Sequence, residues 1–303
     1  MDFGKVKDTR NIDFTLPPDD PATAARLVQG RSGGPLRVYV GCPVWQDDAM
    51  ARKLCAPRTP KAKRLACYGR QFNALEVNST GYGLVRERAA QWASETPEGF
   101  RFCPKVPMDV THGANLDGVW QLFAAQCEAA QAFGDRLGLF FLQFPEQFGP
   151  ARFGELERLL ATQAGKLPLA VEVRHAGWFQ DARWKNRLFD MLEAQGIASI
   201  LTDTPGRRDA LHQRLTTSTA FIRFNGHALG PEDYGRLDAW ALRVKAWMAL
   251  GLRELYLFPH LDPVDRTVEL AAHFIASLNR AAGLNLKMPR IQQAEDEEPS
   301  LAL

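Results

Sequence analysis

Short apolar runs alternate with amphipathic helical stretches along most of this chain. Eight runs recur, and most end in a polar or charged residue: Arg37–Gly41, Ala74–Asn78, Arg101–Lys105, Leu139–Gln143, Leu169–Arg174, Ser199–Asp203, Ala220–Asn225 and Glu254–His260. Strands that alternate with helices pair in parallel, because a parallel neighbour needs a crossover helix. Eight such units predict an α/β protein with a closed (β/α)8 TIM barrel.

The remaining chain predicts one domain with an extension at each end. A barrel of about 250 residues fits residues 36–288 as a single TIM-barrel domain. Residues 1–35 form an N-terminal extension rich in proline and aspartate, with a short helix expected over Ala22–Gln29. Residues 289–303 are expected to be a flexible tail, because the segment is polar and contains the acidic run Glu295–Glu298.

Composition excludes several classes of protein. The net charge is +2, so there is no global electrostatic case for nucleic acid or membrane as a partner. No apolar run approaches the roughly 18 residues of a membrane span, and Met1–Phe14 lacks the apolar stretch of a signal peptide. We therefore expect a cytoplasmic protein, and the sequence does not predict its oligomeric state.

The cysteines predict no disulfide framework. Their number is odd, five, and no C-x-x-C pair occurs. We expect scattered reduced thiols, with a metal cluster of Cys42, Cys55 and Cys67 as the open alternative.

Polar side chains close the predicted strands, and in a TIM barrel the C-terminal ends of the strands meet at one mouth. The candidates are Glu76, Asn78, Lys105, Gln143, Glu172, Arg174, Asp203, Arg223 and Asn225. Period-two alternation places Glu172 and Arg174 together on the inner face of their strand. Such a pair either serves a substrate or is an internal ion pair that only orders the end of the barrel.

Aromatic and histidine side chains lie in the loops after the strands. Trp45, Tyr82 and Trp178 either stack on a sugar or base or simply cover the end of the barrel. His112 is a candidate for substrate binding. We predict no cofactor, because no H-x-H, H-E-x-x-H, G-x-G-x-x-G or P-loop motif is present. A divalent metal stays open as an alternative.

These strand ends resemble the YecE-like family, domain of unknown function 72, over about Arg37–Arg280. The residues that carry the resemblance are Val40–Trp45, Phe72–Thr80, Trp92, Thr96–Phe102, Lys105, Thr111-His112, Leu142–Pro145, Glu172–His175, Trp178-Phe179 and Asp203. The resemblance implies a TIM barrel, and it implies no reaction, because the activity of the family is not established. Two positions depart from the family pattern: Asn225 stands where a histidine is usual, and Phe258-Pro259-His260 replaces an aromatic followed by paired asparagines.

The leading hypothesis is an enzyme of hydrolase or lyase type that acts on a small anionic or phosphorylated substrate. Lys105, Arg174 and Arg223 would hold the anion, and Glu172 or Glu76 would transfer protons, with Asp203 as a further catalytic carboxylate. Two alternatives stay open. One is a scaffold that binds nucleic acid or protein through the basic residues Arg58, Lys61, Lys63 and Arg64. The other is a metal-dependent phosphodiesterase similar to apurinic endonucleases that uses Glu76, His112, Glu172 and Asp203.

Overall fold

The predicted strands are present and form one eight-stranded parallel sheet. We describe the protein from a computed structural model, which covers residues 3–30 and 34–292. The strands are β1 (Arg37–Cys42), β2 (Ala74–Val77), β3 (Arg101–Pro104), β4 (Phe140–Gln143), β5 (Leu169–Glu172), β6 (Ala198–Asp203), β7 (Thr219–Asn225) and β8 (Glu254–His260). Each begins and ends within two residues of its predicted run.

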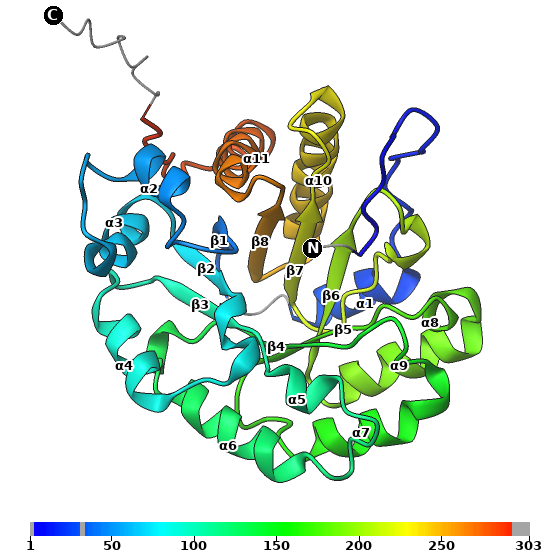
Figure 1. Cartoon of the computed structure of the whole chain (residues 1–303). Helices are drawn as coiled ribbons and strands as arrows, with labels where there is room; N and C mark the ends of the chain where they lie inside the picture. The colour runs from blue at the N-terminus through cyan, green and yellow to red at the C-terminus, as the bar shows by residue number, and fades with distance from the viewer. Residues whose placement is uncertain (1–2, 31–33, 293–303) are drawn as a thin grey trace, which may run out of the picture.

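Helices follow the strands and surround them (Figure 1). They are α1 (Pro21–Gln29), α2 (Asp48–Leu54), α3 (Arg64–Gln71), α4 (Arg86–Ser94), α5 (Met108–Thr111), α6 (Trp120–Gln131), α7 (Phe153–Ala161), α8 (Gly177–Gln180), α9 (Ala182–Ala194), α10 (Pro231–Leu250) and α11 (Thr267–Ala282). The short helix predicted in the N-terminal extension is α1, and Asp20 caps it by accepting a hydrogen bond from the Ala22 amide. Among the described residues, no helix is both long enough and apolar enough to cross a bilayer.

The sheet closes into a barrel, which confirms the predicted fold class. The strand order is β3-β2-β1-β8-β7-β6-β5-β4, with parallel pairing between β1 and β8. The ends of this order, β3 and β4, meet through isolated bridges from Phe102 to Leu137 and from Lys105 to Phe141. The Val106 amide also donates to the Phe141 carbonyl at 2.8 Å.

The barrel interior has its own apolar core, separate from the core between sheet and helices. Every second side chain along each strand points inward. Aromatic rings fill the part of the interior that lies away from the C-terminal ends of the strands. Tyr39 stacks on Tyr256 with ring centroids 4.8 Å apart, and Phe221 meets Phe258 edge to face at 5.4 Å. Because these rings fill that part of the interior, the next inward-facing position of each strand toward its C-terminal end forms the floor of the mouth.

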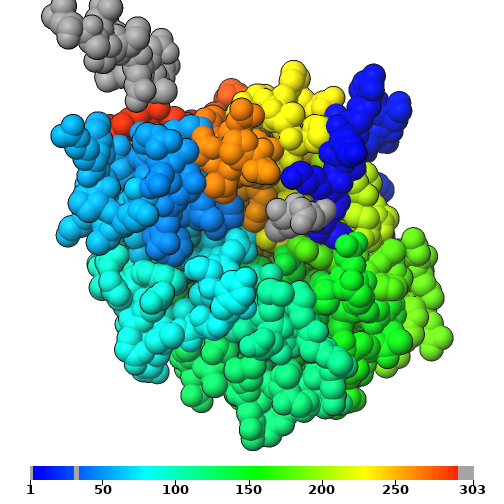
Figure 2. Space-filling view, viewed as in Figure 1, coloured from blue at the N-terminus to red at the C-terminus, as the bar shows by residue number. Residues whose placement is uncertain are grey.

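The N-terminal extension packs on the barrel. Asp19 accepts hydrogen bonds from Arg243 and Trp247 of α10, and Thr9 donates to Glu232 at 2.8 Å. Figures 1 and 2 show these dark-blue residues beside the yellow α10 and the yellow-green β6–β7 connection. The extension is therefore part of the folded domain.

At the other end of the chain, packing continues to Gln292, whose amide donates to the Lys53 carbonyl at 2.8 Å. The rest of the predicted tail lies outside the described residues.

Candidate functional site

A layer of polar side chains closes the mouth end of the barrel, directly above the aromatic interior. Alternation from the inward-facing Ala74, Cys103, Phe141, Ala170 and Phe221 brings the next inward position of each strand to the same level. The side chains at this level are Glu76 of β2, Lys105 after β3, Gln143 of β4, Glu172 of β5 and Arg223 of β7. The structure therefore brings together five of the residues predicted from strand ends.

Arg223 lies at the centre of this layer and is fully buried. Its Nε and Nη2 donate to Glu76 at 2.9 and 2.8 Å, and its Nη1 donates to Glu172 at 2.6 Å. Burial by itself raises the pKa of Glu76, but Arg223 and His260 outweigh it and hold that pKa well below its usual range. Glu76 is therefore ionised, and the one guanidinium of Arg223 binds both Glu76 and Glu172.

Glu172 also gathers side chains on its other side. Arg174 donates to it at 2.6 Å and the Gln143 amide at 2.9 Å. Although burial opposes ionisation, Arg174 and Arg223 lower the pKa of Glu172 to about 2. The Gln143 oxygen accepts in turn from the Lys105 ammonium at 2.8 Å, so Lys105 is bound to a neutral amide. Burial, together with Arg223 and Arg174, lowers the pKa of Lys105.

Glu76 extends the network toward the rim. Asn78 donates to it at 2.9 Å, and Nε2 of His260 lies 3.2 Å from the same carboxylate. Burial is the largest cause that lowers the pKa of His260, although Glu76 opposes it. His260 is consequently neutral at pH 7, with Nε2 facing a carboxylate.

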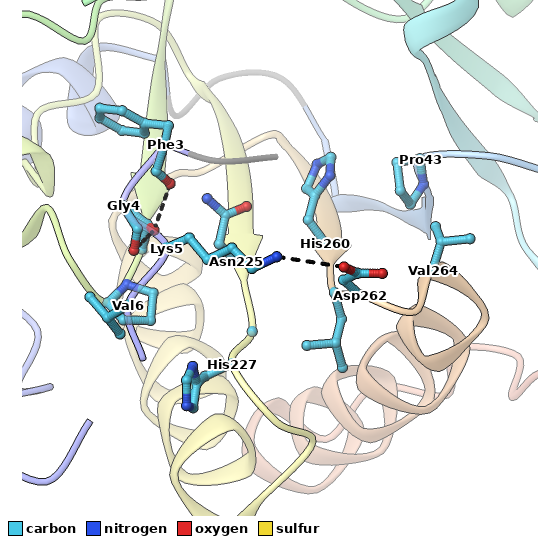
Figure 3. A pocket seen from close by; sticks show the side chains of 14 residues that line it. Phe3, Gly4, Lys5, Val6, Pro43, Asn225, His227, His260, Asp262 and Val264 are labelled. Carbon is cyan, nitrogen blue, oxygen red and sulfur yellow. Dashed lines mark hydrogen bonds and ion pairs between the residues drawn. The ribbon is translucent and has the colours of Figure 1, made fainter. Parts of the chain in front are cut away.

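A cavity of about 440 Å³ opens beside this network. Asn225 and His260, which lie opposite each other in the β7–β8 register, contribute to its wall. Figure 3 shows these two side chains together with His227 on one part of the wall and the N-terminal residues Phe3–Val6 on another. The two positions that depart from the family pattern are therefore neighbours at the same cavity.

Asp203 does not join the network, and the prediction that it converges on the mouth is wrong. Alternation from the inward-facing Ile200 turns Asp203 to the outer face of β6. There it accepts hydrogen bonds from Arg236 at 2.7 Å and Trp240 at 2.8 Å, and it pairs with Arg208. Arg236 and Arg208 outweigh burial and lower its pKa. Asp203 thus holds α10 against the barrel.

The three predicted stacking aromatics also lie away from the cavity wall. Trp178 is fully buried and donates to the Phe148 carbonyl, and Trp45 is buried with its ring edge to face on Trp92. Tyr82 is 93% exposed, in the turn after β2. The two tryptophans are packing residues, because the loops that carry them fold back onto the helical layer. Of the two alternatives for these tryptophans, stacking on a ligand and covering the end of the barrel, their burial favours the second.

His112 lies at the edge of the site. Its Nδ1 is 2.8 Å from the Thr111 hydroxyl, and burial, Lys105 and Arg174 lower its pKa. Within residues 3–30 and 34–292, no group of three or more His, Cys, Asp or Glu side chains is placed to hold a metal ion. The metal set Glu76, His112, Glu172 and Asp203 is accordingly not assembled in this part of the chain.

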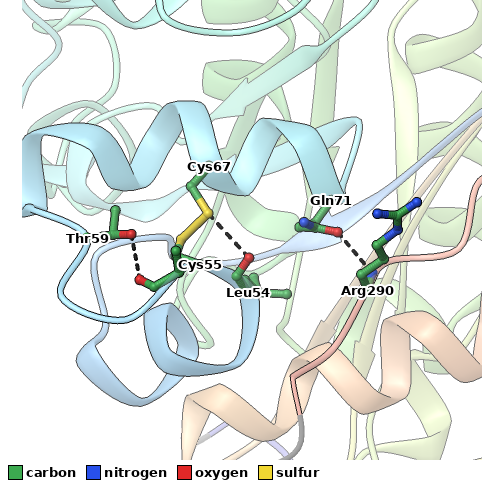
Figure 4. The surroundings of a disulfide bond; sticks show 7 residues. Leu54, Cys55, Thr59, Cys67, Gln71 and Arg290 are labelled. Atoms are coloured by element: carbon green, nitrogen blue, oxygen red, sulfur yellow. Dashed lines mark hydrogen bonds between the residues drawn. A yellow bond between two sulfur atoms is a disulfide. The ribbon is translucent and has the colours of Figure 1, made fainter.

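The expectation that all cysteines are scattered thiols is wrong for one pair. Cys55, at the end of α2, forms a disulfide with Cys67 of α3 (Figure 4). The two helices lie side by side in the long β1–β2 connection and bring the Cα atoms to 5.8 Å, a proximity that cysteine counting cannot detect. Cys42, Cys103 and Cys127 are buried free thiols.

Two parts of the site are not among the residues predicted from the sequence. His260 continues the inward alternation of Tyr256 and Phe258, so the phase of β8 contained the signal. The contribution of Phe3 and Lys5 to the cavity wall had no local signal, since it depends on contacts with residues about 200 positions away.

The fold and the site define a (β/α)8 barrel with an arginine–carboxylate network at its mouth. The family model described as "Protein of unknown function DUF72" matches residues 39–294. This chain therefore belongs to the DUF72 family, the family that the strand-end motifs resemble.

Relatives in sequence and in structure agree with this assignment. The UPF0759 protein YecE of Escherichia coli (strain K12) is 27% identical over 252 residues, which cover 77% of this chain and 89% of the relative. The UPF0759 protein YunF of Bacillus subtilis (strain 168) is 24% identical, covering 62% and 70%. Among solved structures, the DUF72 family protein TM1631 of Thermotoga maritima MSB8 has a TM-score of 0.59 and 22% identity, covering 80% of this chain and 99% of that one. The DUF72 family protein EF0366 of Enterococcus faecalis V583 has a TM-score of 0.59 and 18% identity, covering 82% and 99%. The two solved structures support the barrel fold alone.

Proposed function

We propose that this protein is an enzyme of hydrolase or lyase type that binds a small anionic or phosphorylated substrate at the barrel mouth. The observation that carries the proposal is the environment of Lys105. Its ammonium is half-buried, donates to a neutral amide, and is opposed by the nearby Arg223 and Arg174, which lower its pKa. An incoming anion would relieve this repulsion, and burial strengthens the attraction between them.

The network supports roles that differ from those expected for the two glutamates. Glu76 and Glu172 are ionised, have lowered pKa values and already accept several hydrogen bonds, so they are weak bases and cannot act as acids near pH 7. We assign them to positioning: they fix Arg223 and Arg174 at the mouth. Gln143 then orients Lys105, and Asn78 and Asn225 complete the polar surface.

His260 is the residue that we propose for proton transfer. It lies on the cavity wall and is neutral at pH 7, and Glu76 faces its Nε2. Nε2 also lies 3.4 Å from Arg223 Nη2, but the carboxylate is nearer and favours the tautomer with its proton on Nε2. The other nitrogen, Nδ1, is therefore the one that takes up a proton. The Glu76–His260 pair thus has the arrangement of a general base and its orienting carboxylate.

Phosphate binding tests the anion site. Inorganic phosphate is titrated calorimetrically into the protein and into Lys105→Met, which keeps the side-chain length but removes the charge. We expect the affinity to fall about tenfold or more in Lys105→Met. Lys61→Met, which changes an exposed lysine of the β1–β2 connection, is the matched control and should bind like the unaltered protein. Equal affinity in Lys105→Met and the unaltered protein would refute the site.

Turnover is tested separately on a panel of phosphate monoesters, with released phosphate as the readout. His260→Asn should lose the activity that the unaltered protein shows and retain phosphate affinity within about threefold, because Lys105 is unchanged. Full activity in His260→Asn would remove its proton-transfer role.

A second candidate function is binding of nucleic acid without turnover through the β1–β2 connection. Arg58, Lys61 and Lys63 are exposed there, whereas Arg64 is paired with Asp48. Replacing the three exposed residues with alanine should abolish salt-sensitive binding of a DNA duplex if this function holds, and should leave phosphate binding at the mouth unchanged.

A further inference from the structure

The N-terminal segment Phe3–Val6 forms one wall of the mouth cavity, and it is fastened to the connection that follows β6. The Thr204 hydroxyl lies 3.2 Å from the Phe3 carbonyl oxygen and 3.1 Å from that of Gly4, and its single proton is shared between the two. The Gly206 amide donates to the Gly4 carbonyl at 2.8 Å. Backbone groups of the segment are therefore held at a defined position over the barrel.

Glycine at position 4 makes this close approach possible. Gly4 has a φ of +68°, and a Cβ atom added there would lie 2.4 Å from the Thr204 side chain. A larger residue would both strain the backbone and push the segment away from Thr204. The fit is therefore specific to the residues present.

Phe3 covers the cationic side of the mouth. Phe3 is only 6% exposed, and its ring centroid lies 4.6 Å from the Arg174 guanidinium carbon and 4.9 Å from that of Arg207. Arg207 also donates to the Arg174 carbonyl at 3.0 Å. Because Arg174 binds Glu172 of the central network, the ring restricts access to a part of the site itself.

Lys5 completes the wall from the other side. Figure 3 shows its side chain reaching across the cavity toward Asp262, and the Nζ–Oδ2 distance is 3.5 Å. Both side chains are more than half exposed, so this contact is weak compared with the anchored Phe3. The segment also precedes residue 39, where the match to the family model begins.

We propose that the segment Phe3–Val6 is a size-selecting wall that restricts the mouth to small anions by covering Arg174 and Arg207. The inference rests on the proposed function, in that the mouth binds an anion. Displacing the segment widens the cavity and uncovers the guanidinium groups of Arg174, which pairs with Glu172, and of Arg207, which pairs with Asp209 and Glu146. A longer polyanion gains contacts with them, whereas a single phosphate keeps the same partner, Lys105.

The covering is tested first without any ligand. The protein, Phe3→Ala and Gly4→Val are treated with phenylglyoxal, which modifies accessible guanidinium groups, and modified peptides are quantified by mass spectrometry. Arg174 and Arg207 should react about fivefold faster or more in both variants, because the ring is removed in one and displaced in the other. Arg158, whose side chain is 61% exposed, should react at one rate throughout.

Phe14→Ala is the matched control, since Phe14 lies in the same extension but covers Arg208 and Arg236 instead. Its Arg174 rate should equal that of the unaltered protein. An Arg174 rate that is unchanged in both Phe3→Ala and Gly4→Val would overturn the covering, whatever the ligand results.

Size selection is then measured by calorimetry with inorganic phosphate and tripolyphosphate. In Gly4→Val we expect tripolyphosphate to bind about tenfold more tightly and phosphate to change less than about threefold. If the affinities for both anions change equally, or if neither changes, the segment does not select by size. The proposed anion site itself would be unaffected by that result. If phosphate binds neither form, the proposed function fails, and the selecting role that rests on it fails as well. The labelling result still decides separately whether the segment covers Arg174.

Discussion

Arg223 and Glu76 lie 147 positions apart in the sequence and form a two-hydrogen-bond ion pair inside the barrel, with both side chains fully buried. A buried pair of this kind costs more to break than an exposed one, because the remaining charge loses its partner in a medium that solvates it poorly. The pair links β2 to β7 across the mouth. It couples the stability of the barrel end to the geometry of the site.

Breaking this pair should destabilise the protein strongly. Arg223→Met leaves Glu76 without its bidentate partner, and we expect the free energy of unfolding to fall by about 3–5 kcal/mol. Urea denaturation measures the change. Asp117→Asn breaks the exposed pair with Arg158, 49% and 61% exposed, and should cost no more than about 1 kcal/mol. Similar losses in the two variants would show that burial does not set the strength of the network.

Because of His212, the free energy of unfolding should decrease as the pH is lowered from about 6.5 to 4. Burial lowers the pKa of this histidine from 6.5 to about 4, and its Nε2 lies 3.1 Å from the Ile200 carbonyl. The unfolded chain binds the proton near pH 6.5 and the folded chain only near pH 4. The neutral His212 therefore makes its full contribution to the free energy of unfolding above pH 6.5. That contribution, about 3 kcal/mol, is lost as the pH falls from 6.5 to 4.

Urea denaturation at several pH values checks this prediction. His212→Gln keeps a hydrogen-bonding side chain that does not titrate, so the slope between pH 6.5 and 4 should become shallower by the amount that His212 supplies. The same slope in both proteins would assign the acid sensitivity to other groups.

Asp203→Asn should separate stability from binding. The change removes the nearer of the two buried carboxylates that pair with Arg236, leaving Asp233 at 3.2 Å, and we expect a loss of about 3 kcal/mol in the free energy of unfolding. Phosphate affinity, measured below the unfolding transition, should stay within about twofold, since Asp203 faces α10 and not the mouth. A large loss of phosphate affinity would return Asp203 to the site.

Reducing the disulfide should lower stability without opening the barrel. The cysteines are separated by 12 positions, and a cross-link over a loop of this size stabilises by about 3 kcal/mol. Urea denaturation with and without a reducing agent measures the difference, and Cys55→Ser/Cys67→Ser should show none. Thiol titration of the urea-unfolded protein without reductant should find the three free cysteines, and five after reduction. Five thiols before reduction would exclude the bond.

The sequence predicts the barrel and the polar layer well, for a physical reason. Strands in a barrel are short, buried and parallel, so they appear as apolar runs, and their period-two alternation decides which strand-end residues point inward. Glu76, Glu172 and Arg223 follow from this rule. The same rule, applied from Ile200, turns Asp203 outward, and applied from Tyr256 and Phe258 it adds His260 to the inward-facing residues.

Other parts of the structure depend on contacts that no local pattern encodes. Trp45 and Trp178 face the helical layer because of how their loops turn, and the Cys55–Cys67 bond depends on two helices lying side by side. The wall formed by Phe3 depends on Thr204 and Arg174, both far along the chain. Such long-range pairings become visible only once the fold is known.

A crystal structure of the protein grown with inorganic phosphate shows directly whether the mouth binds an anion. We expect a phosphate at the mouth with an oxygen about 2.7–3.2 Å from Lys105 Nζ. A structure in which phosphate binds only on the β1–β2 connection, with no phosphate oxygen within hydrogen-bond distance of Lys105 Nζ, would contradict it.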